Sequence, residues 1–91
     1  MAILTKSTLI TYKENTHNVP EEFIVDIMEK IPELKSAGKT NAEYDFIDDH
    51  SIRRNWLDQA AVDEWLVFFT ACLEKHGVEA EVLVEETSIP M

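Results

Sequence analysis

The stretch DQAAVDEWLVFFTACLEKHGVEAEVLVEE, residues 58–86, is the part that decides the fold, because it predicts a capped helix followed at once by a strand. Asp58 is a favourable N-cap residue, and Gly77 provides a left-handed exit. Between these ends, apolar side chains recur every three or four positions. They are Ala61, Val62, Trp65, Leu66, Phe69, Cys72 and Leu73. Over residues 78–86, valine and alanine alternate with glutamate, which is typical of a half-buried strand.

A β-hairpin is predicted immediately before this helix. Residues 41–48 alternate between apolar and acidic side chains, and the strand pattern resumes over residues 51–57. The polar run from Asp48 to His50 lies between them and is a turn signal. Together these segments predict two antiparallel strands joined by a tight turn.

Two registers of this hairpin remain open. A three-residue turn gives the pairs Phe46–Ile52, Tyr44–Arg54 and Ala42–Trp56. A turn of two or four residues gives the pairs Ile47–Ile52 and Asp45–Arg54 instead. Because a slip of one residue exchanges the two faces of a strand, the register decides which side chains face the helices.

The N-terminal third predicts a further strand and helix. Residues 2–12 are rich in β-branched and aromatic side chains, as strands are. We expect a helix with Asn18 as its N-cap and Pro20 in its first turn. It should end or kink at Pro32, because proline cannot donate to the preceding turn. Its apolar stripe consists of Phe23, Ile24, Ile27, Met28 and Ile31.

The segments follow one another as strand, helix, strand, strand, helix, strand within a single domain spanning residues 1–91. This is the order of the ferredoxin-like β-α-β-β-α-β motif. Right-handed crossovers then predict an α+β fold. Its four-stranded antiparallel sheet should have the order 4-1-3-2, with both helices on one face.

The other face of this sheet is expected to lack cover from the chain itself. The first strand nevertheless has apolar residues on both faces, with Leu4, Ile10 and Tyr12 on one and Ile3 and Leu9 on the other. A chain of 91 residues also has a small core. Since symmetric dimers are the commonest oligomers, we expect a homodimer formed through the sheet or the large second helix.

Composition limits the partners. Asp and Glu outnumber Lys and Arg by 18 to 8, which gives a formal net charge of -10. Such a chain repels phosphates and anionic lipids, so we expect neither a nucleic-acid nor a membrane partner. The adjacent Arg53 and Arg54 are accordingly expected to pair with Glu43, Asp45 or Asp48. No apolar run reaches the ~20 residues that cross a bilayer, and no signal-peptide pattern opens the sequence, which favours the cytoplasm.

Few side chains in the sequence are typical of a catalytic, metal-binding or ligand-binding site. Cys72 lies on the apolar helix stripe and is interpreted as a core residue rather than a nucleophile. His50 lacks further ligands at metal-site spacing, so neither a metal nor a cofactor is expected, and no catalytic motif occurs. In the first hairpin register, Tyr44, Arg54 and Trp56 lie on or near one sheet face. They are the candidates for binding a small molecule of unknown identity.

The run YDFIDDHSI (44–52), Trp56 and the helix opening DQAAVDEW (58–65) resemble small dimeric α/β-barrel proteins with a ferredoxin-like fold. In particular, they resemble uncharacterised members from marine microbes and phages. The resemblance covers about residues 41–86 and implies the same fold and a dimer. Some relatives of that broad fold are cofactor-independent monooxygenases or bind haem, but no active-site motif is present here to carry across.

Three functions follow from these observations. The leading interpretation is a small acidic homodimeric binding or assembly domain rather than an enzyme. A monooxygenase-like enzyme of the dimeric α/β-barrel type is the alternative, and it predicts a cavity at Tyr44, Arg54 and Trp56. A mimic or inhibitor of a nucleic-acid-binding protein is the third. It predicts one continuous exposed stripe of carboxylates along the last strand and the hairpin.

Overall fold

Residues 3–90, which the computed structural model describes, form four strands and two α-helices. In chain order the elements are β1 (Ile3–Tyr12), the short 3-10 helix η1 (Thr16–Asn18), α1 (Glu21–Ser36), β2 (Thr40–Phe46), β3 (Ser51–Trp56), α2 (Gln59–His76) and β4 (Ala80–Pro90). The predicted α+β order is therefore confirmed. Within these residues, no helix has the length and apolar character that a membrane span needs.

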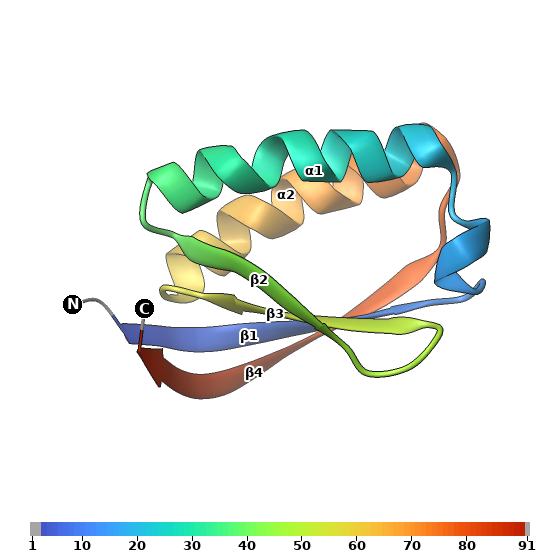
Figure 1. Ribbon diagram of the computed structural model, residues 1–91. Coiled ribbons are helices and arrows are strands. Elements are labelled where there is room, and N and C mark those ends of the chain that lie inside the picture. Colours follow the sequence, from blue (N-terminus) through green and yellow to red (C-terminus); the bar gives the residue numbers. More distant parts are fainter. Residues whose placement is uncertain (1–2, 91) are drawn as a thin grey trace.

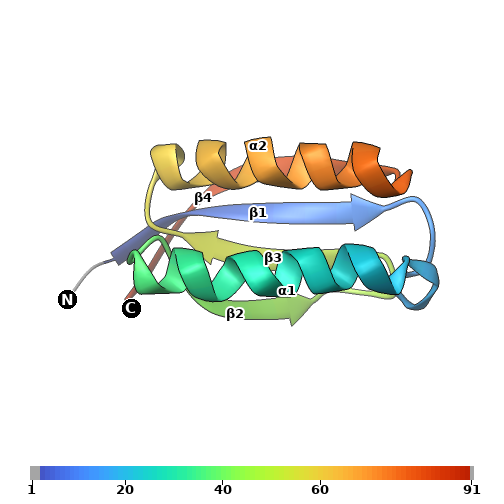
Figure 2. The ribbon, with the colours of Figure 1, turned by 90° about the horizontal axis from the view of Figure 1, so that it is seen from above.

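The four strands form one antiparallel sheet in the order β2-β3-β1-β4, which is the predicted order read from the opposite edge. Both helices cover the same face, with α1 on the β2 side and α2 on the β4 side (Figure 1, Figure 2). This arrangement is consistent with a ferredoxin-like fold. Among the described residues, nothing covers the second face of the sheet or pairs with the outer sides of β2 and β4.

Helix α2 begins and ends as its sequence predicts. The Asp58 side chain accepts a hydrogen bond of 2.9 Å from the backbone N–H three residues on, and Gly77 is left-handed with φ 68°. Lys75 and His76 of the last turn both contact the Asp26 carboxylate of α1, at 3.2 and 2.8 Å. These bonds, first that from His76, hold the pKa of Asp26 below its usual value, and they join the two helices at one end.

Helix α1 starts later than predicted, and Asn18 is not its N-cap. The preceding residues fold into η1 instead, where the Asn15 side chain accepts a 2.9 Å hydrogen bond from the His17 N–H. The chain then turns at Pro20, which offers no side-chain cap, and α1 begins at Glu21. A polar side chain near a helix start thus capped a shorter, earlier turn.

Helix α1 also extends past Pro32, where its sequence predicted an end or a kink. It continues to Ser36, and Leu34 in this extension is buried in the core. Burial of a leucine side chain contributes about 1.5–3 kcal/mol, which offsets the hydrogen bond that the proline cannot donate. The exit at Gly38 is as expected, with φ 76°.

The hairpin adopts the first of its two open registers, with the pairs Tyr44–Arg54 and Phe46–Ile52. The third expected pair is wrong, because Thr40 rather than Ala42 lies opposite Trp56. Residues 41–43 form a bulge in β2, and Ala42 has φ 66°, a conformation that residues other than glycine adopt rarely. The bulge therefore shifts the start of β2 relative to its end.

Strand β4 is longer than predicted and lies later in the sequence. It begins at Ala80 rather than Val78, and it extends to Pro90 instead of ending near Thr87. The reason is its partner, because β4 pairs along the whole of β1, from Tyr12–Ala80 at one end to Ile3–Pro90 at the other. Pairing with a long neighbour extended the strand beyond its own alternating pattern.

The core lies between the sheet and the helices and is built around two tryptophans. The Trp56 and Trp65 rings stack with centroids 5.1 Å apart, and Trp65 stacks on Phe69 at 5.5 Å. The Trp56 indole N–H donates a 2.9 Å hydrogen bond to Thr8 Oγ1. The other buried members of this cluster are Ile10, Tyr12, Phe23, Ile27, Ile31, Leu34, Ala61, Val62 and Cys72.

Candidate functional site

The structure brings two of the three predicted site residues together and leaves the third apart. Tyr44, Arg54 and Trp56 share the helix-covered side of the sheet, as the hairpin register requires. Trp56 is 0% exposed and belongs to the tryptophan core. Tyr44 lies on the edge strand, and its ring covers the Arg54 guanidinium, whose Cζ atom is 4.8 Å from the ring centroid. A ligand-binding role for these residues stays a prediction.

Arg54 is a buried cation, with only 5% of its surface exposed. None of the ion pairs found among residues 3–90 includes it, and the ion pair of Arg53 is with Glu85. The expected pairing with Glu43, Asp45 or Asp48 is therefore wrong for both arginines. The hairpin register explains the difference. Asp45 lies opposite Arg53 and therefore shares the uncovered face with it, whereas Arg54 points to the helices.

The surroundings of Arg54 affect two titrating groups. Burial lowers the pKa of Arg54, while the neighbouring Tyr12 and Tyr44 act in the opposite direction. Burial also raises the pKa of Tyr12 to about 12, against the effect of Arg54. The ring of Tyr44 is thus the group that the structure places over the buried guanidinium of Arg54.

The cavity expected of an enzyme at these residues is not found in the described part of the chain. Five hollows of about 220–530 Å³ lie on this surface, and none of the five is lined by Tyr44, Arg54 or Trp56. The side chains of Trp56 and Arg54 fill the space under the helices instead.

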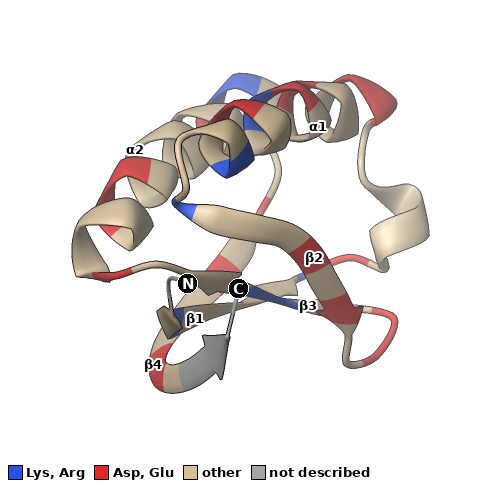
Figure 3. Ribbon diagram, turned by 60° about the vertical axis from the view of Figure 1, so that its left-hand side comes forward, with Lys and Arg blue, Asp and Glu red and all other residues tan. Residues whose placement is uncertain are grey.

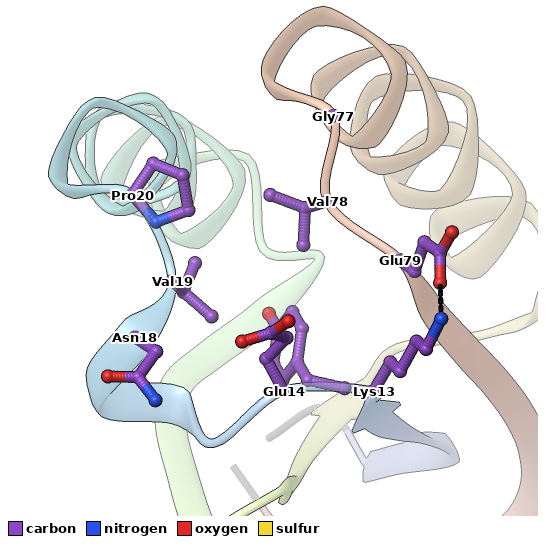
Figure 4. A pocket seen from close by; sticks show the side chains of 9 residues that line it. Lys13, Glu14, Asn18, Val19, Pro20, Gly77, Val78 and Glu79 are labelled. Atoms are coloured by element: carbon purple, nitrogen blue, oxygen red, sulfur yellow. Dashed lines mark ion pairs between the residues drawn. The ribbon is translucent and has the colours of Figure 1, made fainter.

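One hollow lies at the end of the sheet near η1 (Figure 4). It has a volume of about 400 Å³, and Val19 and Val78 line it from opposite sides. The Lys13 ammonium and the Glu79 carboxylate lie beside it, 2.9 Å apart, so this cation is paired within the chain. The hollow is open to solvent and brings no nucleophile next to a base.

One flank of α1 is apolar and exposed, which corrects its predicted stripe. The flank of α1 that carries Asp26 and Lys30 faces α2. Asp26 bonds His76 of α2, and Lys30 Nζ lies 5.6 Å from the centroid of the Phe68 ring of α2. Ile24 and Met28 lie on the opposite flank, on the side of β2. Both are exposed rather than buried, because the core-facing positions of α1 are already filled.

Exposed apolar side chains also lie on β2. Tyr44 and Phe46 share the helix side of the strand, and their rings meet edge to face with centroids 5.3 Å apart. Phe46 is 61% exposed, and Ile47 after it is exposed as well. We call this surface the edge patch. It consists of Ile24, Met28, Tyr44, Phe46 and Ile47.

Beside the edge patch, the outer side of β2 has backbone groups that are not paired with a described strand. The Ile47 N–H donates to the Ser51 carbonyl oxygen of β3 at 2.9 Å. Bonded positions alternate along an antiparallel strand, so the N–H and C=O groups of Tyr44 and Phe46 point away from β3. No described strand pairs with that side of β2.

Carboxylates surround this free edge. They are Glu43, Asp45, Asp48 and Asp49, on β2 and the hairpin turn (Figure 3). None of them takes part in an ion pair found among the described residues. Asp48 does accept a 2.7 Å hydrogen bond from the His50 N–H, which lowers its pKa. The edge therefore combines an apolar side with an acidic side.

The uncovered face of the sheet is mostly polar, with two leucines at its centre. Leu9 of β1 lies opposite Leu83 of β4, and Leu83 is 55% exposed. The surrounding residues on this face are Ser7, Thr11, Asp45, Ser51, Arg53, Asn55, Glu81 and Glu85. Arg53 contacts Glu85 at 3.5 Å, while Arg53 Nε and Asn55 Oδ1 are buried and have no hydrogen-bond partner.

The other reactive side chains form no site in the described residues. Cys72 is buried in the core, and burial is the main cause that raises the pKa of its thiol. Among residues 3–90, no group of three or more His, Cys, Asp and Glu side chains is arranged to hold a metal ion. His50 lies at the turn, where its Nδ1 is 3.2 Å from the Tyr12 carbonyl oxygen.

The edge patch is the feature that the sequence reasoning missed. Ile24 and Met28 fit helical spacing, so the predicted apolar stripe of this helix includes them. The sequence did contain a signal, because this helix has more apolar residues than one stripe needs: Phe23, Ile27 and Ile31 already complete a stripe. A second pair one turn apart beside a full stripe indicates a second contact surface. Ile47 gave a similar sign, since it follows Phe46 directly and breaks the alternation of the strand.

Comparisons with known proteins add the fold alone. No protein-family model matches the chain, and no curated protein matches it. Among solved structures, the chain is similar to the solution structure of a hypothetical protein from Arabidopsis thaliana. The two share 14% sequence identity over 97% of this chain and 89% of that one, with a TM-score of 0.52. At this identity, the likeness concerns the arrangement of strands and helices and says nothing of activity.

Proposed function

We propose that this chain is a binding or assembly domain rather than an enzyme, and that it forms a homodimer by stacking the uncovered faces of two sheets. The observation that carries the proposal is the Leu9–Leu83 pair at the centre of a face that no described residue covers. A two-fold axis through this face brings the leucines of two copies together. Each Å² of apolar surface removed from water there contributes about 25 cal/mol.

The polar groups around the leucines support the same arrangement. Arg53 Nε and Asn55 Oδ1 are buried without partners, and a buried polar atom left unpaired costs about 1–3 kcal/mol. The face also carries the carboxylate of Glu81 and the hydroxyl of Thr11, so a second copy would bring polar groups to it. The stacked face would then be apolar at the two leucines and polar around them.

The two alternative functions have less support. A monooxygenase-like enzyme needs a chamber at Tyr44, Arg54 and Trp56, and none of the five hollows is lined by these residues. A nucleic-acid mimic needs one continuous acidic stripe. Acidic residues lie instead on both helices, on β2 and on β4 (Figure 3), so the charge is distributed over several faces.

The test measures mass as a function of concentration. Light scattering and sedimentation at micromolar concentrations are expected to give a species of twice the chain mass of 10.5 kDa. Leu83→Glu places a charge between the stacked leucines and should weaken the dimer by about tenfold or more. Val67→Glu adds the same charge on α2, at a site that is 76% exposed, and should leave the dimer intact.

Two results would overturn the dimer. One is a 10.5 kDa species at every concentration measured. The other is a dimer that Leu83→Glu and Val67→Glu weaken to the same extent, because the interface would then not involve the uncovered face. Circular dichroism of each variant shows that it is folded before its mass is interpreted.

A further inference from the structure

We propose that the free edge of β2 binds an extended segment of another protein, which adds as a fifth strand and alternates apolar with basic residues. The inference uses a different surface from the dimer, so it stands or fails independently of the proposed function. Three features of the β2 edge determine which segment binds there. They are backbone groups that no described strand pairs with, one apolar and one acidic face, and carboxylates that form no ion pair found among the described residues.

The backbone of β2 supplies the affinity common to strand addition. The N–H and C=O groups of Tyr44 and Phe46 point away from β3, since the Ile47 N–H is already bonded to Ser51. An extended peptide at this edge pairs with these groups and so continues the ladder. The order of the sheet leaves this side of β2 without a neighbour in the described chain.

The two faces of β2 determine which side chains the added strand must carry. On the helix side, the strand meets the exposed rings of Phe46 and Tyr44, which belong to the edge patch. Exposed apolar surface of this kind is typical of an interface. On the uncovered side it meets Asp45. Alternate residues of the partner must therefore be apolar and basic.

Charge separates this occupant from a second copy of the chain. Pairing of two β2 strands through the free groups of both Tyr44 and Phe46 sets the Asp45 carboxylates of the two copies directly opposite each other. Like charges opposite each other across two strands are destabilising. The net charge of -10 adds repulsion between copies, whereas it attracts a basic segment.

The buried Arg54 holds the side chain of Tyr44, which is part of the edge patch, in place. Its guanidinium lies under the Tyr44 ring and has no carboxylate partner among the described residues. The contact holds Tyr44 against the sheet beside Phe46, so a partner meets an ordered pair of rings. Arg54 is therefore a positioning residue for the edge patch.

The experiment uses the full chain and a seven-residue peptide in which lysine and valine alternate, acetylated and amidated at its ends. Hydrogen exchange followed by NMR should show at least tenfold slower exchange of the Tyr44 and Phe46 amides at saturating peptide. A control peptide of the same composition, with all lysines before all valines, has the same charge but cannot present two faces. It should bind at least tenfold more weakly.

Variants of the chain locate the contact. Phe46→Lys should weaken binding of the alternating peptide by about tenfold. Val67→Lys makes the same charge change at an exposed site on α2 and should leave the affinity for the peptide unchanged. Asp45→Asn should weaken it about threefold and reduce the dependence of affinity on salt.

Several outcomes would overturn the inference. Equal binding of the two peptides would show attraction by charge alone, and protection confined to β4 amides would place the strand on the other edge. Equal affinities of Phe46→Lys and Val67→Lys would remove the edge patch from the contact. Protection of Tyr44 and Phe46 that rises with protein concentration, without peptide, would make a second copy the occupant.

Discussion

The two outer strands of the sheet, β2 and β4, differ in how they meet solvent. β2 presents an aromatic pair, Tyr44 and Phe46, beside an apolar helix flank. β4 exposes Glu81 and Glu85 and places Leu83 on the uncovered face. Charged residues on an edge strand are a known defence against unwanted pairing. One edge of this small sheet is therefore protected, and the other is suited to a partner.

The support beneath the two edges differs as well. Among the described strands, β2 pairs with β3 alone, and the Trp56 ring of β3 is stacked in the core. β4 pairs along the whole of β1, from Tyr12–Ala80 to Ile3–Pro90. The same sheet thus holds one edge by packing of a large side chain and the other by a long ladder. This difference can be tested one strand at a time.

The largest effect is expected when the support of β2 is removed. Trp56→Ala creates a cavity against Trp65 and leaves Thr8 Oγ1 without its donor, so the free energy of unfolding should fall by about 3–5 kcal/mol. Chemical denaturation followed by circular dichroism measures the change. Leu83→Ala on β4, measured below the concentration at which the proposed dimer forms, should cost less than about 1 kcal/mol, because Leu83 is exposed in the single chain. Equal losses would contradict the difference in support.

Alkaline pH gives an intermediate effect, which acts at the end of β1, where Tyr12 lies opposite Ala80 of β4. Burial raises the pKa of Tyr12 to about 12 from its ordinary value of 10.0. The folded state therefore holds this proton more tightly than the unfolded state. Stability is unaffected below about pH 10 and falls as the pH rises towards 12, by up to about 2–3 kcal/mol.

Tyr12→Phe should abolish this component of the alkaline decline, as measured by denaturation at pH 8, 10 and 11. Tyr44→Phe is the matched control, because it removes a phenol from an exposed ring and leaves Tyr12 in place. A decline that survives in Tyr12→Phe and vanishes in Tyr44→Phe would show that the titrating group lies at the edge instead.

The smallest effect compares an alanine on each edge strand. Ala42 in the β2 bulge has φ 66°, which costs an L-residue about 1 kcal/mol and glycine almost nothing. Ala42→Gly should therefore raise the free energy of unfolding by about 0.5–1 kcal/mol. Ala80→Gly, in the regular ladder of β4, should lower it by a similar amount. Thermal unfolding resolves the opposite signs, and a loss in both variants would count against the bulge.

Local signals in the sequence were sufficient for most of the fold. Asp58 and Gly77 lie at the two ends of α2 as expected, and the turn after Phe46 sets the hairpin register for two pairs. Prediction failed where a distant partner decided the outcome. Leu34 gained enough from the core to carry α1 through Pro32, and β1 extended β4 as far as Pro90. Neither effect is encoded in the residues next to the element that changed.

The candidate surfaces were predicted less completely for the same reason. The sequence placed Tyr44 and Arg54 on one face, and the structure confirms that placement. It did not show that Trp56 fills the space beside them or that Ile24 borders them. The orientation of α1 depends on Asp26 meeting His76, two residues fifty positions apart. A pattern within one helix cannot reveal which flank such a contact leaves exposed.

The bulge at residues 41–43 has a consequence for stoichiometry. It interrupts the regular ladder of β2, so only the three residues from Tyr44 to Phe46 are straight enough to template a neighbour. With β4 guarded by glutamates, growth of the sheet has a single short starting point and no second one. We therefore expect β2 to recruit one short segment of a partner rather than to extend the sheet through repeated copies of the chain.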